Sequence, residues 1–355
     1  MGAGFVFDDV HSRCVLFGGG WDTGSGMGSF GDMWVLDSIS GNWSEVNFVG
    51  GPWARFNFQM GYSRDHDCIV VFSSAGGRMG DTWVYDVVEA EWARVRTDVS
   101  PVQRGDAGFV YDEKYGVFIM YGGMSDVNPL RVLNDTWVYD PESNTWTEMR
   151  PETSPPRTYG CRFIYDSVNE MAMLWGGNLP DGHGGKLDDW WSYDYQSNTW
   201  TMIETEEKPP MRYWQFMEFD RAAGKVVMFG GHPSYGNNLG DTWLYDYAEN
   251  EWTLVESEVS PSPRQTGSMV YDESIERIVL FGGFEDDMEA VGDTWVFDSE
   301  VGEWLLLEDF NASINTGDDG ARIPGFYLIA VLIALCWVVV SMKLEIDEMA
   351  WTCLI

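Results

Sequence analysis

The sequence predicts an all-β protein built from six copies of one structural unit, followed by a single apolar segment near the C-terminus. A seven-residue motif, GDTWVYD at residues 80–86, occurs in six copies whose starts are 49, 54, 54, 52 and 52 residues apart. A period of that size indicates a repeat architecture in which each unit is one supersecondary element. In all six copies a second tryptophan follows nine residues after the first. The pairs are Trp34/Trp43, Trp83/Trp92, Trp137/Trp146, Trp191/Trp200, Trp243/Trp252 and Trp295/Trp304.

Each repeat contains four short apolar runs that are typical of β-strands. In the third repeat these are residues 108–112, residues 117–121, residues 136–140 and a run that begins at Trp146. β-branched and aromatic residues fill the runs, and Gly, Asp, Asn and Pro separate them, which is the usual strand signal. A Gly-Gly pair closes the second run in most repeats. No stretch before residue 320 shows a helical period.

The composition narrows the possible partners. The 355 residues include 21 Lys and Arg against 57 Asp and Glu, which gives a net charge of −36. That charge repels phosphates, so we expect no nucleic-acid partner. The five cysteines do not form a disulfide framework and do not identify the compartment. Cys14 and Cys68 occupy equivalent strand positions, where a small buried apolar residue fits.

The pattern of strand, Phe/Tyr-Gly-Gly, variable loop, Asp-x-Trp-x-Tyr-Asp and a later tryptophan resembles the kelch repeat. The resemblance covers residues 4–307 and implies a six-bladed β-propeller, whose blades are four-stranded antiparallel sheets around a channel. The implied blades are residues 1–47, 48–98, 99–151, 152–205, 206–257 and 258–307. The first repeat lacks the Pro and Arg that precede the other five. Either the ring closes by packing alone, or Met1 is not the true start.

The C-terminal region is predicted to hold a membrane anchor. Residues 308–322 form a polar, acidic linker, and residues 323–342 are uncharged. Twenty helical residues span about 30 Å, which is enough to cross a bilayer core, so we expect a single transmembrane helix and a membrane partner here. Residues 343–355 form a short tail. The flanking charges leave the orientation undecided, although a glycosylation sequon at Asn311 slightly favours a propeller outside the cytoplasm.

One face of the propeller is expected to carry the binding site. In a four-stranded antiparallel blade, the connection between the second and third strands shares a face with the connections between blades. The distance from the Gly-Gly position to the motif tryptophan varies between 9 and 15 residues across the six repeats. Variable loops on a rigid scaffold usually carry binding.

Five arginines that follow a proline before the first strand could form a cationic ring for an acidic partner. They are Arg55, Arg104, Arg157, Arg212 and Arg264. The alternative, which we favour, is that a residue present in every available blade serves the blade by hydrogen-bonding loop carbonyls. The six motif aspartates are explained by turn capping rather than by cation binding. They are Asp32, Asp81, Asp135, Asp189, Asp241 and Asp293.

Loop residues that do not repeat are the stronger candidates for binding. They are Trp21, Asp22, Asn128, Arg131, Asp181, His183, His232, Tyr235, Glu285, Asp286 and Asp287. The acidic run that begins at Glu285 is read as a solvated loop rather than a calcium site.

The function predicted from these features is a membrane-anchored, non-enzymatic module that binds a protein or glycan partner and needs no cofactor. The alternative is a metal- or carbohydrate-dependent enzyme at the channel mouth, similar to galactose oxidase or a sugar epimerase. Enzymes similar to galactose oxidase need two histidines and two tyrosines at one metal. Only His183 and His232 fall on the appropriate face, and no matching Tyr/Cys pair is visible.

Overall fold

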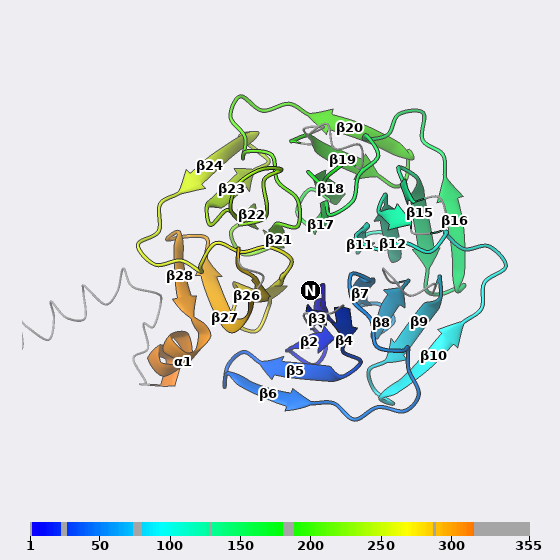
Figure 1. Ribbon diagram of the computed structural model, residues 1–355, viewed down its shortest axis with the longest axis horizontal. Coiled ribbons are helices and arrows are strands. Elements are labelled where there is room, and N and C mark those ends of the chain that lie inside the picture. Colours follow the sequence, from blue (N-terminus) through cyan, green and yellow to red (C-terminus); the bar gives the residue numbers. More distant parts are fainter. Residues whose placement is uncertain are drawn as a thin grey trace, which may run out of the picture. The chain divides into compact units, whose positions relative to one another are not determined.

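The computed structural model describes residues 2–22, 27–73, 80–125, 127, 130–179, 188–286 and 289–315. The chain divides into two compact units, Met1–Leu307 and Glu308–Ile355. The first unit is a closed ring of six four-stranded antiparallel sheets around a central channel (Figure 1). The predicted all-β, six-bladed propeller is therefore confirmed.

Each blade runs from an inner first strand to an outer fourth strand. The first three blades are β1 (Gly4–Asp8), β2 (Arg13–Phe17), β5 (Met33–Asp37), β6 (Asn42–Glu45); β7 (Gln59–Ser63), β8 (Cys68–Phe72), β9 (Thr82–Asp86), β10 (Glu91–Val95); and β11 (Gly108–Asp112), β12 (Val117–Tyr121), β15 (Thr136–Asp140), β16 (Thr145–Met149). The last three are β17 (Arg162–Asp166), β18 (Met171–Trp175), β19 (Trp190–Asp194), β20 (Thr199–Ile203); β21 (Phe216–Asp220), β22 (Lys225–Phe229), β23 (Thr242–Asp246), β24 (Glu251–Val255); and β25 (Ser268–Asp272), β26 (Arg277–Phe284), β27 (Ala290–Asp298), β28 (Glu303–Leu306). Two small hairpins, β3 (Gly20–Asp22) with β4 (Met27–Ser29) and β13 (Met124–Ser125) with β14 (Arg131–Val132), extend the loops of the first and third blades.

The ring closes by packing between the first and last blades. Strand β1 lies beside β25, and the Ser268 hydroxyl donates a hydrogen bond to the carbonyl oxygen of Ala3 at 3.0 Å. The ring of Phe281 packs against Phe5 and Trp43, with centroids 6.2 and 4.9 Å apart. Among the described strands, none is shared between the two blades.

The second tryptophan of each repeat packs between neighbouring blades, as the sequence predicts for the repeated aromatic residues. The indole N–H of Trp146, Trp200 and Trp304 donates to a motif threonine of the preceding blade at 2.9–3.0 Å. These threonines are Thr82, Thr136 and Thr242. In the first and fourth blades Met33 and Trp190 replace the threonine. The indoles that follow them in the ring, those of Trp92 and Trp252, have buried N–H groups without a partner.

The two faces of the ring differ. The hairpin face carries the turns that join the first strand to the second and the third to the fourth, for example between β1 and β2. The loop face carries the connections that leave β2, β8, β12, β18, β22 and β26 for the third strand, together with the segments that link successive blades. Bridges between these two kinds of segment, Gly105 to Met124, Tyr159 to Asn178, Tyr213 to His232 and Gln265 to Phe284, show that they share one face, as strand parity predicts.

A short helix follows the last blade, so the expectation of no helix before residue 320 is wrong. Helix α1 (Leu307–Asn315) begins at the last residue of the predicted sixth blade and continues into the predicted linker. Glu308 and Asp309 in its first turn complement the positive end of the helix dipole. Residues 323–342 and 343–355, predicted as a membrane helix and tail, lie outside the described residues. Within the described part of the chain, no helix is long and apolar enough to cross a bilayer.

Replacing Thr136 by Val tests the hydrogen bond between blades. The change keeps the side-chain shape but leaves the Trp200 N–H buried without an acceptor, so we expect the free energy of unfolding to fall by about 1–3 kcal/mol. Urea denaturation followed by tryptophan fluorescence measures the effect. Thr136→Ser keeps the acceptor and is the matched control. Equal stability of the Val and Ser variants would show that the bond contributes nothing.

Candidate functional site

Four of the five predicted arginines are buried inside the blades. The fully buried side chains are Arg55, Arg104, Arg212 and Arg264. Arg104 is representative, because its guanidinium donates to the carbonyl oxygens of Val102 at 3.0 Å and Gly122 at 2.9 Å. It also donates to both carboxylate oxygens of Asp135. The structure therefore does not bring these four arginines together as a cationic ring. It supports the alternative, in which each one holds its own blade together.

Four of the six motif aspartates, Asp81, Asp135, Asp241 and Asp293, are the partners of these arginines, which corrects the expectation that they cap turns. Asp135 accepts from Arg104 and, at 2.7 Å, from the Trp137 indole N–H. Burial alone would raise the pKa of Asp135, but the hydrogen bonds and charge of Arg104 outweigh it and hold that pKa below its usual range. Asp241 and Asp293 behave in the same way. The same hydrogen bond from a tryptophan recurs at Asp32 and Asp81, which accept from the indole N–H groups of Trp34 and Trp83 at 2.7 Å.

The fourth blade departs from this pattern. The prediction that Arg157 hydrogen-bonds loop carbonyls of its blade, as the other four arginines do, is wrong. Arg157 is exposed, and the buried position belongs to Thr158, whose hydroxyl donates to the Gly176 carbonyl oxygen at 3.2 Å. Asp189 has no arginine partner among the described residues. Burial, together with the charge of Asp188, raises its pKa, while Lys208 opposes the shift. The nearby Trp191 indole N–H has no hydrogen-bond partner.

The non-repeating loop residues are only partly placed. Asn128, Asp181, His183 and Asp287 lie outside the described residues, and Trp21 and Asp22 belong to β3, where only the backbone is described. Arg131 and Tyr235 are exposed on the loop face, and His232 and Glu285 are half-buried there. The amide N–H of Asn238 donates to the carboxylate of Asp286 at 2.5 Å, so the loops of the fifth and sixth blades are joined.

An aromatic cluster lies on the loop face over the fourth and fifth blades. It consists of Tyr159, Tyr213, Trp214 and His232, all half-buried. The ring centroid of Tyr213 lies 4.7 Å from that of Trp214 and 5.4 Å from that of His232. The centroids of Tyr159 and Trp214 are 6.4 Å apart. The Nδ1 atom of His232 is buried without a partner. These rings offer an apolar surface with polar edges, which suits the recognition of another polypeptide.

Main-chain hydrogen bonds hold this cluster beside the channel. One residue in each blade, two positions before the first strand, has a positive φ. These residues are Gly2, Asn57, Asp106, Gly160, Trp214 and Thr266. Each from Asn57 onward donates its N–H to the carbonyl oxygen of the preceding one, at 2.8–3.2 Å. The φ of +55° at Trp214 is unusual for a bulky residue, and a Cβ added at Gly160 would lie 2.9 Å from the Trp214 ring.

Asp106 ties the loop-face mouth of the channel together. Its carboxylate accepts from the Trp214 indole N–H and the Asn57 amide, both at 3.2 Å. Burial raises the pKa of Asp106 to about 6, although these hydrogen bonds and Arg162 oppose the shift. Because Asn57, Asp106 and Trp214 come from three blades, the carboxylate links the second, third and fifth blades across the opening.

The channel itself is lined by the first strands and has a volume of about 270 Å³. Near the hairpin face, Arg64 pairs with Asp9 and Glu273, and Arg221 pairs with Glu113 and Glu273. Deeper in the channel, burial raises the pKa of Glu218 to about 7. The Arg162 guanidinium donates to the carbonyl oxygens of Gln215 and Gly267. The three arginines of the channel, Arg64, Arg162 and Arg221, thus have acceptors within the propeller.

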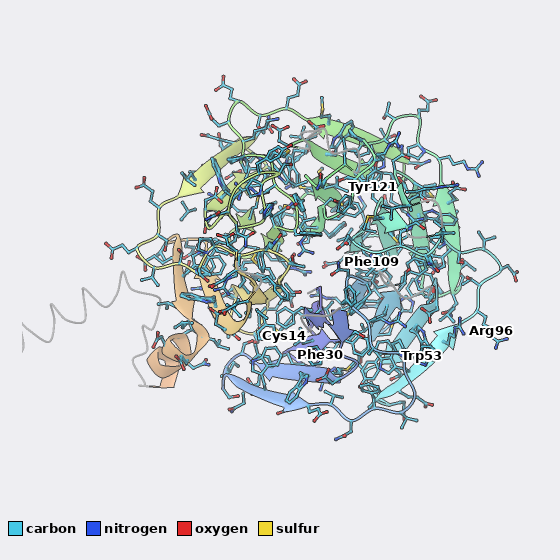
Figure 2. All side chains as sticks on the ribbon, viewed as in Figure 1. Cys14, Phe30, Trp53, Arg96, Phe109 and Tyr121 are labelled. Carbon is cyan, nitrogen blue, oxygen red and sulfur yellow. The ribbon has the colours of Figure 1, made fainter. Side chains whose placement is uncertain are left out.

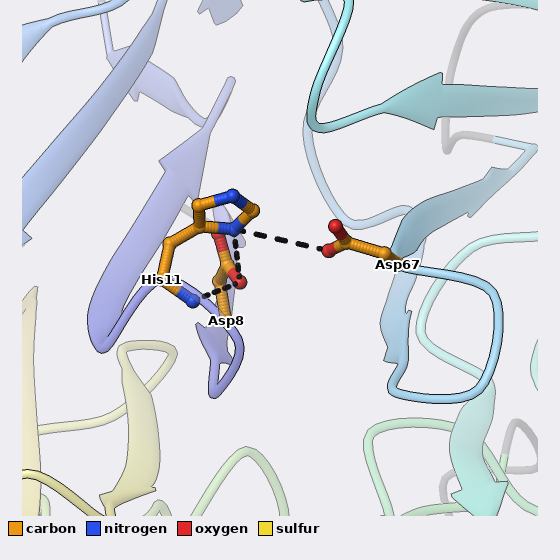
Figure 3. A group of neighbouring side chains, drawn as sticks. All are labelled: Asp8, His11 and Asp67. Atoms are coloured by element: carbon orange, nitrogen blue, oxygen red, sulfur yellow. Dashed lines mark hydrogen bonds and ion pairs between the residues drawn. The ribbon is translucent and has the colours of Figure 1, made fainter.

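The described residues contain one group of side chains with the composition of a metal site, Asp8, His11 and Asp67, on the hairpin face (Figure 3). Nδ1 of His11 lies 3.0 Å from Asp8 and 3.8 Å from Asp67. Asp8 also accepts from the His11 main-chain N–H and from the Arg13 guanidinium at 2.9 Å. Asp67 accepts from the Tyr62 hydroxyl at 2.9 Å. The carboxylates are thus occupied by protein donors, and Arg13 already supplies a positive charge.

Comparison with known proteins agrees with this geometry. A family model described as the KLHDC2/KLHL20/DRC7 Kelch-repeats domain matches residues 1–167 and 164–316. The chain belongs to the kelch-repeat family.

Curated relatives match this chain over part of their own length. An F-box/kelch-repeat protein, At1g51550, of Arabidopsis thaliana is 28% identical over 47% of this chain and 37% of its own. Acyl-CoA-binding domain-containing protein 4 of Arabidopsis thaliana is 27% identical over 56% of this chain and 29% of its own. Mei4-dependent protein 6 of Schizosaccharomyces pombe is 23% identical over 84% of this chain and 39% of its own. The chain thus matches well under half the length of each of these relatives.

Sequence reasoning missed the aromatic cluster of the kelch propeller except for His232. It sought function in the loops between second and third strands, whereas Tyr159, Tyr213 and Trp214 belong to the segments between blades. A signal was present, because aligning the residues two positions before each first strand places Trp214 where small or polar residues stand in the other blades. A bulky residue at a position where the other repeats have small or polar residues is not required by the repeat, and it therefore indicates a role particular to that blade.

Matched substitutions distinguish the buried arginines from Arg157. Arg104→Met leaves Asp135 as an uncompensated, largely buried charge, and we expect the free energy of unfolding to fall by about 3–5 kcal/mol. Arg157→Met removes an exposed side chain and is expected to change it by less than about 0.5 kcal/mol. Urea denaturation of the two variants measures both values. Comparable losses would contradict the structural role assigned to Arg104.

Glu218 gives the kelch propeller a pH-dependent stability. Its pKa is raised from 4.5 to about 7 in the folded state, so between these pH values the folded protein binds more protons than the unfolded chain. This contribution to stability is therefore full below about pH 4.5 and lost as the pH rises through about 7. Glu218→Gln cannot ionise and keeps the oxygen that accepts from the Phe219 N–H.

We expect the melting temperature of Glu218→Gln, relative to the unsubstituted protein, to be higher at pH 8 than at pH 5. Differential scanning calorimetry at the two pH values measures this difference. Exposed Glu91→Gln serves as the control. A difference that does not change with pH would show that Glu218 ionises normally in the folded protein.

Proposed function

We propose that this kelch propeller is a protein-binding module that recognises its partner through the loop face. The observation that carries the proposal is the distribution of exposed aromatic side chains. Among the described residues these are Phe30, Trp53 and Tyr235, which are 46%, 78% and 81% exposed, and all three belong to the loop face. The large exposed apolar residues in the turns of the hairpin face are aliphatic: Val10, Ile39, Val88, Val168 and Val301.

The aromatic side chains are spread across the loop face rather than gathered in a catalytic cleft. Phe30 and Trp53 come from adjoining parts of the first and second blades (Figure 2), where the Arg55 main-chain N–H donates to the Phe30 carbonyl oxygen at 2.9 Å. Tyr235 lies in the same loop, between β22 and β23, as His232 of the aromatic cluster. Tyr and Trp are enriched at the energetic centres of protein interfaces because they bury large areas with few rotatable bonds. This arrangement supports a broad polypeptide contact.

The net charge of −36 indicates the character of the partner. A strongly acidic protein attracts basic surfaces and repels acidic ones, which affects the association rate more than the final affinity. We therefore propose a partner with a basic contact surface, bound faster at low than at high salt. A membrane anchor at residues 323–342 stays a prediction from the sequence, and so does the side of the membrane on which the propeller lies. A glycan partner also stays a prediction from the sequence.

Two pairs of variants test the loop face against the hairpin face. Trp53→Ser and Tyr235→Ser remove exposed aromatic area from the loop face. Val88→Ser and Val168→Ser remove exposed apolar area from the hairpin face. Affinity purification with quantitative mass spectrometry should show that the proteins enriched with the unsubstituted chain are retained by the valine variants. The same proteins should be depleted at least about ten-fold by the aromatic variants, because interface aromatics commonly contribute about 2 kcal/mol.

An equal set of partners on all four variants would place the binding surface elsewhere. Depletion by the valine variants alone would move it to the hairpin face.

A further inference from the structure

We propose that the aromatic cluster on the loop face takes an arginine side chain of the partner polypeptide, whose guanidinium stacks on the rings of Tyr159, Tyr213 and Trp214. Two observations carry the proposal, the mutual inclination of the three rings and the carboxylate of Asp106 beside them. The proposal rests on the proposed function, because it names the chemistry that the partner brings to this face.

The three rings face different directions instead of stacking flat on one another. The ring plane of Trp214 is inclined by 59° to that of Tyr213 and by 67° to that of Tyr159. The two tyrosine rings are inclined by 56° to each other. All three residues are half-buried, so each is partly accessible from solvent. Rings inclined in this way can contact a cationic group on more than one side, as in the aromatic cages that bind cations.

Hydrogen bonds hold two of the rings before any partner binds. The Trp214 indole N–H donates to the carboxylate of Asp106 at 3.2 Å, and the Tyr159 hydroxyl accepts from the side-chain amide of Asn178 at 3.1 Å. Trp214 also has a φ of +55°, which is a strained conformation for a bulky residue. Strained residues that the surrounding structure holds in place are common at ligand-binding sites. The cluster is therefore ordered in advance, which reduces the entropy lost on binding.

Asp106 places a negative charge against the cluster. With a pKa of about 6, its carboxyl group is ionised in about nine molecules of ten at pH 7. Burial and, to a smaller extent, this charge raise the pKa of Tyr159, so the charge acts on a second ring. Within the described ranges, Asp106 forms no ion pair with an arginine or lysine. The charge of Arg162 acts on Asp106, but its guanidinium donates to main-chain carbonyl oxygens. The carboxylate thus attracts a cation that approaches the rings.

An arginine of the partner can occupy a position that the chain leaves open. Among the residues that the structure describes, the cation that lies over an aromatic ring is Lys114, 5.5 Å from the ring centroid of Tyr115 on the hairpin face. Within that part of the chain, the three rings of the cluster carry no cation of their own. A guanidinium suits them better than an ammonium group, because it is planar, more weakly hydrated and stacks on aromatic faces. The net charge of −36 also favours a cationic ligand.

Fluorine NMR of the full chain, labelled with fluorotryptophan, tests the proposal at the ring itself. The resonance of Trp214 is identified as the one that is lost in Trp214→Phe. We expect the peptide Gly-Arg-Gly, with blocked ends, to shift this resonance saturably with a dissociation constant in the millimolar range. A peptide with citrulline in place of arginine keeps the shape without the charge and should bind at least about five-fold more weakly. The resonance of the exposed Trp53 should not respond.

Two tyrosine variants complete the experiment. Tyr213→Leu removes one aromatic face from the cluster and should weaken the arginine peptide at least about five-fold. Tyr115→Leu removes a half-buried ring from the hairpin face and should leave its affinity unchanged. The proposal is overturned by absence of a Trp214 response at millimolar peptide, by equal affinity for the citrulline peptide, by tighter binding of a lysine peptide, or by equal losses in the two variants. The citrulline comparison decides the question even where Tyr213→Leu fails to fold.

The outcome is separable from that of the proposed function. If the Trp214 resonance does not respond while Trp53→Ser and Tyr235→Ser still lose the partner, the assignment of the cluster fails and the assignment of the loop face stands. If the arginine peptide binds at the cluster but the two serine variants keep every partner, the rings are an arginine site and the proposed function fails.

Discussion

One main-chain hydrogen bond between successive blades, from the first to the sixth, at the loop-face mouth of the channel, sets the geometry on which the rest of the propeller depends. The donor and acceptor lie two residues before each first strand, at a positive φ. That conformation turns the incoming chain into the channel wall, so the first strands stand side by side and the second to fourth strands fan outward. A side chain at this position also points across the mouth, which is how Asp106 and Trp214 come to meet.

The buried arginines perform the corresponding work farther out. Each takes a charge out of water, which is costly unless the charge is paired and its donors are satisfied. The motif aspartate and the carbonyl at the end of the second strand meet that requirement for Arg104, Arg212 and Arg264, whereas Nη2 of Arg55 is buried without a hydrogen-bond partner. The fourth blade departs from this unit, because Thr158 replaces the arginine with a hydroxyl.

Strand order and blade number follow from the sequence because the spacing between GDTWVYD and the second tryptophan is the same in all six repeats. Variation in the sequence of a single repeat therefore does not change the assignment. Single positions are less secure. In the fourth blade Thr158 rather than Arg157 enters the core. Each buried arginine lies three residues after a proline, in the pairs Pro52/Arg55, Pro101/Arg104, Pro209/Arg212 and Pro261/Arg264, and Thr158 has this spacing from Pro155. The exact spacing, rather than the presence of an arginine after a proline, therefore identifies the core position. Aspartate commonly caps turns, and its pairing with an arginine 26–31 residues earlier along the chain becomes visible only when the blade is assembled.

The same reasoning explains why the candidate site was hard to find. Residues repeated in every blade stabilise every blade, and they leave little freedom for a ligand. Function is therefore expected where the repeat is broken on the loop face, at Trp214, which stands among Asn, Asp, Gly and Thr in the same ring of positions. This departure keeps the main-chain hydrogen bonds of the repeat. The Trp214 ring is half-buried and held by its hydrogen bond to Asp106, so the scaffold has oriented it before a partner binds, which is the physical condition for a preorganised binding surface.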